Sequence, residues 1–262
     1  MEETITSVQN PKIRQLLALQ QKSSLRRESG LFVVEGIREL EHCLEAGYAV
    51  DSVFCCKEIL PKGLSCTLPD GTRIFQVSRA VYEKVAYREG TEGVIAEVHS
   101  RFITLEDLNL PENPLVVVLE SVEKPGNLGA VLRSADAAGA DAVLVCDALT
   151  DIYNPNLIRA SLGAVFSVPV VCCSSEQAIT FLKGKGIGIF TAQLQDSELY
   201  YDTPMKGGTA LVMGTESTGL TDIWRQAADA HIRIPMLGKL DSLNVSVSTA
   251  ILLFEAVRQR NA

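Results

Sequence analysis

The 262-residue sequence has no surplus of positive charge and no long apolar run. Its 24 Lys and Arg stand against 32 Asp and Glu, a formal net charge of -8, which argues against holding nucleic acid through a broad positive surface. No stretch reaches the roughly 18 uninterrupted apolar residues of a membrane span, and the N-terminus lacks an apolar signal segment. We therefore expect a soluble, cytoplasmic protein that does not contact membranes.

Paired cysteine motifs are also lacking. The seven cysteines are an odd total without C-x-x-C spacing, and most lie in apolar runs. This usage predicts reduced core thiols and argues against a disulfide framework, a zinc site or another bound metal. The three histidines have no obvious partners for hydrolytic catalysis, so we expect them to be structural or surface residues.

The length allows two compact domains, although one large domain remains possible. Residues 1–100 predict a small α/β unit that begins with a helix, for which Asn10 is the cap and Pro11 the first residue. Periodicity lapses in RFITLEDLNLPENP, which suits a linker over residues 101–112. Residues 113–262 form the second predicted domain.

A local basic cluster precedes the first hydrophobic strand. It comprises Lys12, Arg14, Lys22, Arg26 and Arg27. A solvated helix face is one interpretation. Contact with RNA phosphates is the other, since an acidic chain must use local clusters for that purpose.

In the second domain, continuous Val, Leu and Ile runs alternate with amphipathic helical patterns. This alternation predicts a parallel sheet covered by helices on both faces. Ligands in such sheets bind at the carboxyl ends of strands. The loops of interest therefore follow Glu120, Met213 and Pro235.

Each of these loops has an ordinary explanation when taken alone. Glycines in LESVEKPGNLGAVLR could simply allow a helix to pack on the sheet, and Glu216 in LVMGTESTGL could favour a helix N-terminus. The third segment, IPMLGKLDSLNVSVS, carries Ser242, Asn244, Ser246 and Ser248. Helix capping explains one such residue but hardly four.

Together, the three segments resemble the SpoU/TrmH family of the SPOUT superfamily, which are RNA ribose 2'-O-methyltransferases. The signatures are N-x-G-x-x-x-R, G-x-E-x-x-G-L and I-P-M-x-G-x-x-x-S-L-N-V-S-V, and the resemblance is close over residues 113–260. It implies an α/β protein whose C-terminal parallel-sheet SPOUT domain contains a trefoil knot. The first hundred residues resemble the family's small α/β substrate-binding domain, and the family's active sites imply a homodimer.

The resemblance also implies roles for individual residues. The catalytic set carried over by motif position is Asn127, Arg133, Glu216, Ser242 and Asn244. Groups around Gly214, Ile234, Met236 and Leu243 would hold the cofactor, S-adenosylmethionine.

Within this resemblance, we expect Arg133 to contact the ribose hydroxyl and its adjoining phosphate. Arginine keeps its proton, which favours orientation and charge stabilisation over general-base catalysis. The RNA phosphate could accept the proton, with Glu216 and Asn127 fixing Arg133.

The expected function is thus methylation of a ribose 2'-hydroxyl in a structured RNA, either rRNA or tRNA. Analogy with ribosomal-protein-like modules favours rRNA. One alternative is a non-catalytic RNA-binding or ribosome-assembly protein with a methyltransferase fold. Another is a knotted enzyme that methylates a base nitrogen, which the N-x-G-x-x-x-R and S-L-N-V-S-V loops disfavour.

Overall fold

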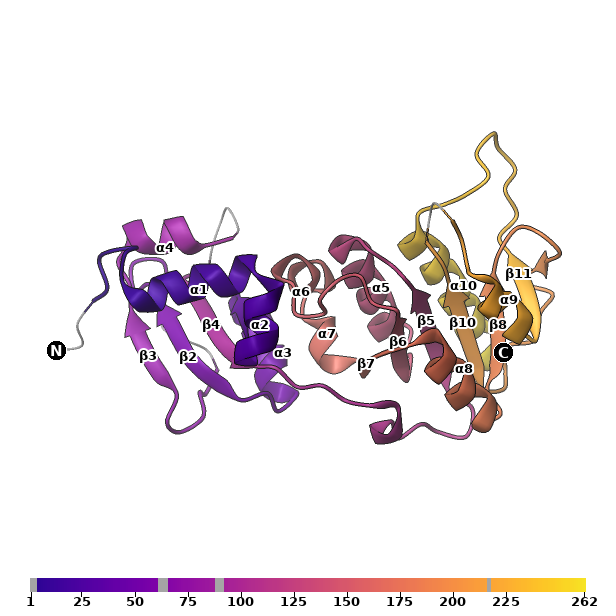
Figure 1. Ribbon diagram of the computed structural model, residues 1–262, viewed down its shortest axis with the longest axis horizontal. Coiled ribbons are helices and arrows are strands. Elements are labelled where there is room, and N and C mark those ends of the chain that lie inside the picture. The colour runs from indigo at the N-terminus through magenta and orange to yellow at the C-terminus, as the bar shows by residue number, and fades with distance from the viewer. Residues whose placement is uncertain (1–3, 61–65, 88–91, 216–217) are drawn as a thin grey trace. The chain divides into compact units, whose positions relative to one another are not determined.

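The structure, a computed structural model, describes residues 4–60, 66–87, 92–215 and 218–262 (Figure 1). Its contacts divide the chain into two units. The first comprises the residues up to Arg101 together with Asp151–Ser167, and the second comprises Phe102–Thr150 and Val168–Ala262. The chain therefore passes between the units three times. The functional division at residues 100 and 113 stays a prediction.

The first unit contains a four-stranded sheet in the order β1-β4-β2-β3. β4 is antiparallel to both β1 and β2, whereas β3 is parallel to β2. The strands are β1 (Leu31–Glu35), β2 (Val50–Cys55), β3 (Arg73–Gln76) and β4 (Val94–His99). The helices are α1 (Pro11–Gln21), α2 (Ser23–Ser29), α3 (Ile37–Glu45), α4 (Arg79–Val85), α6 (Pro155–Ser161) and α7 (Ala164–Ser167).

Helix α1 begins as its sequence predicts. The side chain of Asn10 accepts a hydrogen bond from the backbone N–H of Lys12 at 3.0 Å, and Pro11 occupies the first turn. Ile13, Leu16 and Leu19 then form one buried face against the sheet. This spacing is what an amphipathic helix needs to cover an apolar surface.

Arg26 corrects the interpretation of the basic cluster. Its side chain is buried, and Nε lies 2.6 Å from Oδ2 of Asp151 while Nη1 donates to the carbonyl of Leu19. Lys12, Arg14, Lys22 and Arg27 are exposed. Arg26 is therefore an internal ion-pair partner and cannot contact RNA phosphates.

Aromatic packing explains why residues 151–167 belong to the first unit. The ring of Tyr153 stacks on Phe32 of β1 at 4.2 Å between centroids. Phe166 of α7 lies 5.9 Å from Phe32 and 5.2 Å from Tyr48. Because the rings of Phe32, Tyr153 and Phe166 are buried, this segment completes the core of the first unit.

The second unit contains a seven-stranded sheet in the order β7-β6-β5-β10-β8-β11-β9. Every pair of neighbouring strands is parallel, as the sequence predicts. The strands are β5 (Leu115–Glu120), β6 (Ala142–Cys146), β7 (Val170–Cys173), β8 (Gly188–Ala192), β9 (Glu198–Leu199), β10 (Thr209–Met213) and β11 (Ala230–Arg233).

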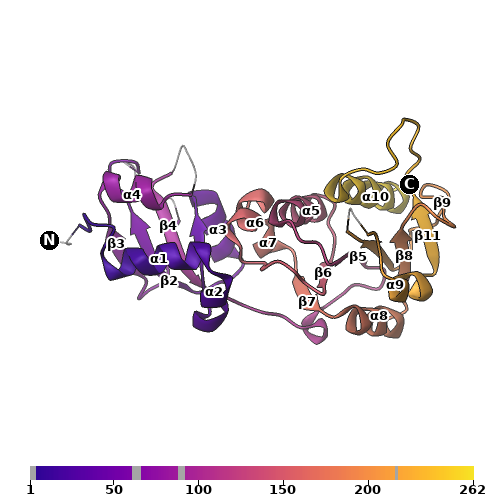
Figure 2. The same cartoon turned by 45° about the horizontal axis from the view of Figure 1, so that its top comes forward.

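Helices cover this sheet on both faces. Helices α5 (Pro125–Ala137) and α10 (Val245–Arg260) pack together on one face, and α8 (Ser175–Gly184) and α9 (Asp222–Ala227) lie on the other (Figure 2). The short helix η1 (Leu105–Asp107) adds buried Leu105 and the adjacent Leu108 to the core. The segment predicted as a linker thus contributes to the second unit.

None of the seven cysteines, all of which lie within the described residues, forms a disulfide, and four of them are buried. Cys172 is exposed, so the prediction of core thiols fails at that residue. A hydrogen bond with Cys173 and burial raise the pKa of the Cys146 thiol. Within the described ranges, no three His, Cys, Asp or Glu side chains gather as a metal site. Nor does any helix there have the length and apolar character needed to span a bilayer.

Candidate functional site

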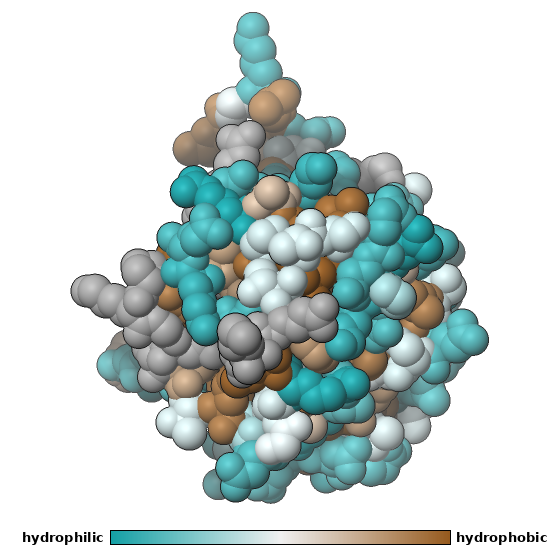
Figure 3. Space-filling view, turned by 90° about the vertical axis from the view of Figure 1, so that its left-hand side faces the viewer, coloured by the Kyte–Doolittle hydropathy of each residue, from teal (hydrophilic) through white to brown (hydrophobic). Residues whose placement is uncertain are grey.

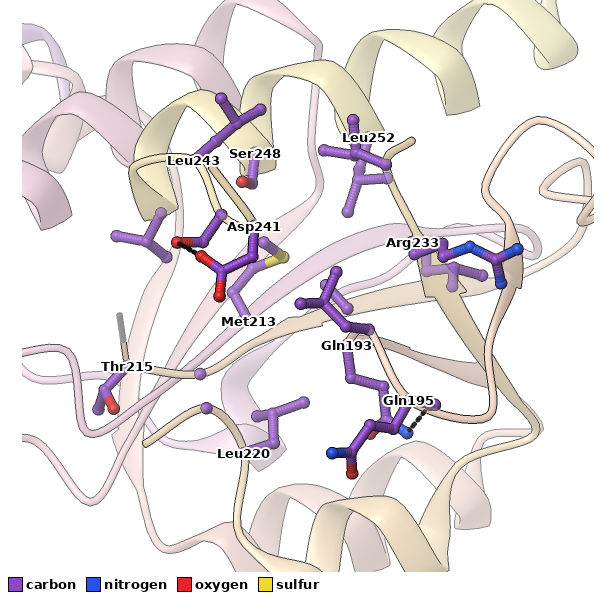
Figure 4. A pocket seen from close by; sticks show the side chains of 18 of the residues that line it. Gln193, Gln195, Met213, Thr215, Leu220, Arg233, Asp241, Leu243, Ser248 and Leu252 are labelled. Carbon is purple, nitrogen blue, oxygen red and sulfur yellow. Dashed lines mark hydrogen bonds between the residues drawn. The ribbon is translucent and has the colours of Figure 1, made fainter. Parts of the chain in front are cut away.

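A pocket of about 470 Å³ lies in the second unit, where the chain leaves β8, β10 and β11 and enters α10 (Figure 4). Carboxyl ends of parallel strands are the expected place for a ligand in such a sheet. The volume falls within the range of about 300–1,000 Å³ that is typical of small-molecule sites. Its walls combine apolar side chains, such as Met213, Leu220 and Leu252, with polar groups.

The loop after β10 forms one wall of this pocket through Gly214, Thr215, Gly219 and Leu220. A Cβ atom on Gly214 would lie only 2.3 Å from the carbonyl carbon of Gly219, so this close approach requires glycine. Gly219 has a φ of +68°, a conformation that side chains disfavour. Glu216, predicted to be catalytic, lies outside the described residues.

Buried Glu120, at the end of β5, anchors the end of that loop. Its Oε2 accepts a hydrogen bond from the backbone N–H of Thr221 at 2.9 Å. The hydroxyl of Thr221 also donates to Oε1 of Glu120, at 2.5 Å. Beside it, Ser175 donates to Asp147 at 2.6 Å and receives a hydrogen bond from the indole of Trp224 at 2.9 Å. Sequence reasoning placed a loop after Glu120 but did not predict this anchoring role.

The segment after β11 forms the opposite wall. Ile234, Met236, Ser242 and Leu243 all line the pocket. Three of these were predicted to bind the cofactor and Ser242 to be catalytic; the structure places all four together with Gly214.

Asn244 combines two contacts at the start of α10. Its Oδ1 accepts from the backbone N–H of Ser246 at 3.0 Å, which caps the helix. Its Nδ2 donates to Oδ1 of Asn127 in the first turn of α5, at 3.1 Å. The structure therefore brings together Asn127 and Asn244 from signatures that are 117 residues apart.

Arg133 is exposed on α5 and does not line the pocket. It lies almost two helical turns beyond Asn127 along the same helix. Of the predicted catalytic residues that the structure describes, Ser242 is at the pocket and the two asparagines contact each other. Arg133 is not gathered with them within this chain.

Charged groups stand at different places around the pocket. Asp241 is the only carboxylate among the described lining residues, and Arg225 and Arg233 are the cations. Figure 4 shows the Asp241 carboxylate projecting into the pocket and the Arg233 side chain lying well away from it. The described lining therefore carries both signs of charge, and its one carboxylate, that of Asp241, is exposed to solvent.

The loop after β8 was missed by sequence reasoning. Gln193, Leu194 and Gln195 line the pocket. The carboxyl end of the IGIFTA strand was the available signal, but only the sheet order places β8 between β10 and β11.

Comparisons with known proteins agree with this geometry. Residues 114–254 match the SpoU rRNA Methylase family, and residues 10–96 match the MRM3-like substrate binding domain. The chain is 30% identical to the 23S rRNA (guanosine(2553)-2'-O)-methyltransferase RlmP of Bacillus subtilis, over 95% of this chain and 97% of that protein.

Solved structures resemble the whole chain. One is an RNA 2'-O ribose methyltransferase, with a TM-score of 0.87 and 38% identity over 99% of this chain and 100% of the other. Another is an AdoMet-bound rRNA methyltransferase from Sinorhizobium meliloti, with a TM-score of 0.89 and 29% identity over 98% and 97% of the two chains.

Proposed function

This chain belongs to the SpoU rRNA Methylase family, and from that premise we propose that it methylates a ribose 2'-hydroxyl of ribosomal RNA rather than transfer RNA. It is an S-adenosylmethionine-dependent RNA 2'-O-methyltransferase. The observation that carries the choice of rRNA is the full-length similarity to a relative named for 23S rRNA. The MRM3-like substrate binding domain in residues 10–96 supports a dedicated RNA-binding unit.

The pocket suits S-adenosylmethionine in size and in charge. When bound, the donor supplies a methyl group on a positively charged sulfur. Leu220, Leu243 and Leu252 offer apolar surface for its adenosine part, and backbone groups around Gly214 and Ile234 offer hydrogen bonds. The carboxylate of Asp241 provides the opposite charge.

The ribose of the substrate lies at the side of the pocket marked by Ser242 and Asn244. Asn127 and Asn244 hold each other in place through their amide hydrogen bond, and together they orient the nucleotide. Arg133 contacts the 2'-hydroxyl and the adjoining phosphate, stabilising negative charge while remaining protonated. The RNA phosphate accepts the hydroxyl proton, and Glu216 helps to fix Arg133.

A homodimer completes this site. Arg133 lies outside the pocket lining of its own chain, which supports a site to which a second copy contributes. Val247 and Phe254 of α10 are 47% and 48% exposed, and such apolar side chains on one helix favour burial against a partner.

The catalytic domain also contains a trefoil knot, as the family resemblance implies. The sheet order supports it, because β10 lies between β5 and β8 and the last segment begins from β11. The knot would bring residues 234–244 beside the loop after β10, where both line the pocket.

The first unit binds the RNA substrate. Lys12, Arg14, Lys22 and Arg27 are exposed on or beside α1 and α2, and phosphate contacts by such residues position a nucleic acid. Figure 3 views the side where β3 and α4 lie in Figure 1, and hydrophilic residues make up much of that surface.

The test uses the full chain, methyl-labelled donor, and separate ribosomal and transfer RNA from cells that lack the enzyme. We expect label in 23S rRNA, in a dinucleotide that resists alkali because its 2'-hydroxyl is blocked. Label in transfer RNA alone would refute the rRNA assignment, and an alkali-sensitive product would indicate base methylation. Donor binding without transfer to any RNA would favour a non-catalytic RNA-binding or assembly role.

A further inference from the structure

Two cysteines lie side by side where neighbouring strands end, away from the pocket. Cys146 ends β6 and Cys173 ends β7, and their Cα atoms are paired in the register of the sheet. Residues in register on parallel strands point to the same face, and both of these pack into the core on the α8 side. Their sulfur atoms are 4.0 Å apart and share a hydrogen bond. The two thiols are therefore in direct contact.

The spacing of β6 and β7 permits a disulfide between these cysteines. Neighbouring strands lie about 4.7–4.9 Å apart, and the Cα atoms of disulfide-bonded cysteines are usually about 4.4–6.8 Å apart. The sulfur atoms must approach each other by about 2 Å to reach the bonded distance of about 2.05 Å. Rotation about the two Cα–Cβ bonds supplies this movement, so the strands can stay in register.

The two thiols differ in their access to solvent. Cys146 is fully buried. Cys173 is half-buried and lines an open hollow of about 610 Å³ in the second unit. Phe102 and Glu106 line one part of this hollow, and Phe181 of α8 lines another. A small molecule in solution therefore reaches Cys173 but not Cys146.

The same difference decides which sulfur carries negative charge. Burial disfavours the charged form of a thiol, so Cys146 keeps its proton and donates it in the hydrogen bond. That hydrogen bond lowers the pKa of the Cys173 thiol by more than burial and the Asp147 carboxylate raise it. Cys173 also directly precedes Ser174, the N-cap of α8, and helix N-termini stabilise thiolates. The accessible sulfur is thus the nucleophile of the pair.

We propose that Cys173 and Cys146 form a reversible oxidation site for hydrogen peroxide, in which Cys173 is the reacting thiol and Cys146 the resolving thiol. The Cys173 thiolate attacks one peroxide oxygen, the O–O bond breaks, and Cys173 becomes a sulfenic acid while hydroxide leaves and takes a proton from solvent. Cys146 then attacks the sulfur of Cys173. A disulfide forms, and the sulfenic hydroxyl leaves as water with the proton of Cys146.

The two steps balance without a further reactant. Two thiols lose two electrons and two protons, peroxide gains both, and the products are one disulfide and two water molecules. A dithiol such as dithiothreitol reverses the reaction by thiol–disulfide exchange. No methyl donor takes part, so this site is independent of the proposed function.

The resolving thiol decides how far the oxidation proceeds. A sulfenic acid that meets more peroxide becomes a sulfinic and then a sulfonic acid, and thiols do not reverse these products. Because Cys146 is already in contact with Cys173, it intercepts the sulfenic acid first. Alternation along β7 turns the side chain of exposed Cys172 to the other side of the strand, away from Cys146. Cys172 is therefore a matched control one residue from the reacting thiol.

Peptide mapping of the full chain tests the proposal. The chain is treated with hydrogen peroxide, alkylated and digested with trypsin. Cleavage after Arg133, Arg159 and Lys183 releases residues 134–159, which hold Cys146 alone, and residues 160–183, which hold Cys172 and Cys173. We expect these two peptides to be joined, with a mass lower than their sum by two hydrogen atoms, and dithiothreitol to separate them. Two unlinked peptides after oxidation would overturn the proposal.

Three variants separate the roles of the cysteines. Cys172→Ala should keep the link, and Cys173→Ala should abolish it and leave Cys146 as a thiol. Cys146→Ala should accumulate Cys173 with two or three added oxygen atoms, about tenfold more than the unaltered chain at equal exposure. A link that survives in Cys173→Ala but not in Cys172→Ala would overturn the assignment of the reacting thiol. Equal over-oxidation with and without Cys146 would overturn its resolving role.

Folding of each variant is followed separately. Trp224, the only tryptophan, is buried in the same core cluster as Cys146, so its unchanged emission shows that a variant is folded. Methyl transfer is not part of any readout. Failure of the oxidation site therefore leaves the proposed function untouched, and a chain without methyltransferase activity would still show or lack the disulfide.

Discussion

The buried ion pair between Arg26 and Asp151 gives a prediction whose size follows from the structure. Arg26→Ala removes the 2.6 Å contact with Asp151 and a second 2.6 Å hydrogen bond to the Leu19 carbonyl. The side chains of Arg26 and Asp151 are 4% and 13% exposed. Losing one partner of a buried pair costs roughly 3–5 kcal/mol, and partial access of water to Asp151 favours the lower figure of about 3 kcal/mol.

The expected result is a large loss of stability in the first unit. At roughly 4–8 °C per kcal/mol for a domain of about 100 residues, its Tm should fall by roughly 10 °C or more. Scanning calorimetry measures this, and fluorescence of Trp224, the only tryptophan, follows the second unit separately. Arg27→Ala, an exposed neighbour, should change stability by less than about 0.5 kcal/mol but weaken RNA binding.

The opposite pattern would refute this reasoning. If Arg26→Ala leaves the Tm within a degree and weakens RNA binding as Arg27→Ala does, the side chain reaches the surface in solution. The ion pair would then contribute little to the fold.

Further predictions address catalysis, assembly, domain structure and pH. Arg133→Ala should reduce methyl transfer at least a hundredfold while calorimetry shows donor affinity within twofold, and retained turnover would contradict its role. Phe254→Glu should convert a dimer into a monomer of 28.4 kDa in light scattering; a monomeric unaltered chain would refute the dimer. A fragment of residues 102–262 should bind S-adenosylmethionine but methylate RNA poorly and aggregate more than the full chain, because Tyr153 and Phe166 lose their partners; efficient methylation would contradict RNA capture by the first unit. Burial raises the pKa of Glu97, so its neutral form is favoured in the fold, and the associated stability is lost as pH rises through the folded pKa. Glu97→Gln should therefore raise the Tm more at pH 8 than at pH 4, and an equal gain at both would refute it.

The sequence patterns predicted the second unit's sheet for a physical reason. A strand buried on both faces must be apolar at every position, so LVVVLE and DAVLVC give a signal that needs no tertiary information. The loops after Met213 and after β11 were likewise predictable, because ligands gather at carboxyl ends. The loop of Gln193 was not, since it depends on β8 being inserted beside β10.

The sequence interpretation failed in part of the first unit, because the core there depends on contacts between residues that are far apart in the sequence. Residues 151–167 follow a strand of the parallel sheet, and their sequence pattern predicts a helical connection to the next strand of that sheet. Their partners, Phe32 and Tyr48, lie more than 100 residues earlier. Arg26 and Asp151 are also far apart in the sequence, so the sequence alone does not reveal that they pair. Arg26, which the sequence analysis assigned to a solvated or RNA-facing surface, is buried.

Residues 151–167, which complete the core of the first unit, also set an order of events during synthesis. The first unit lacks Tyr153 and Phe166 until the ribosome has added 66 residues beyond Arg101, counted to Ser167. At roughly 5–20 residues per second, this delay is about 3–13 s. During it, the aromatic face around Phe32 is uncovered and open to non-native contacts. The N-terminal unit therefore cannot finish folding first, as N-terminal domains usually do, and must wait for β5, α5 and β6 to emerge.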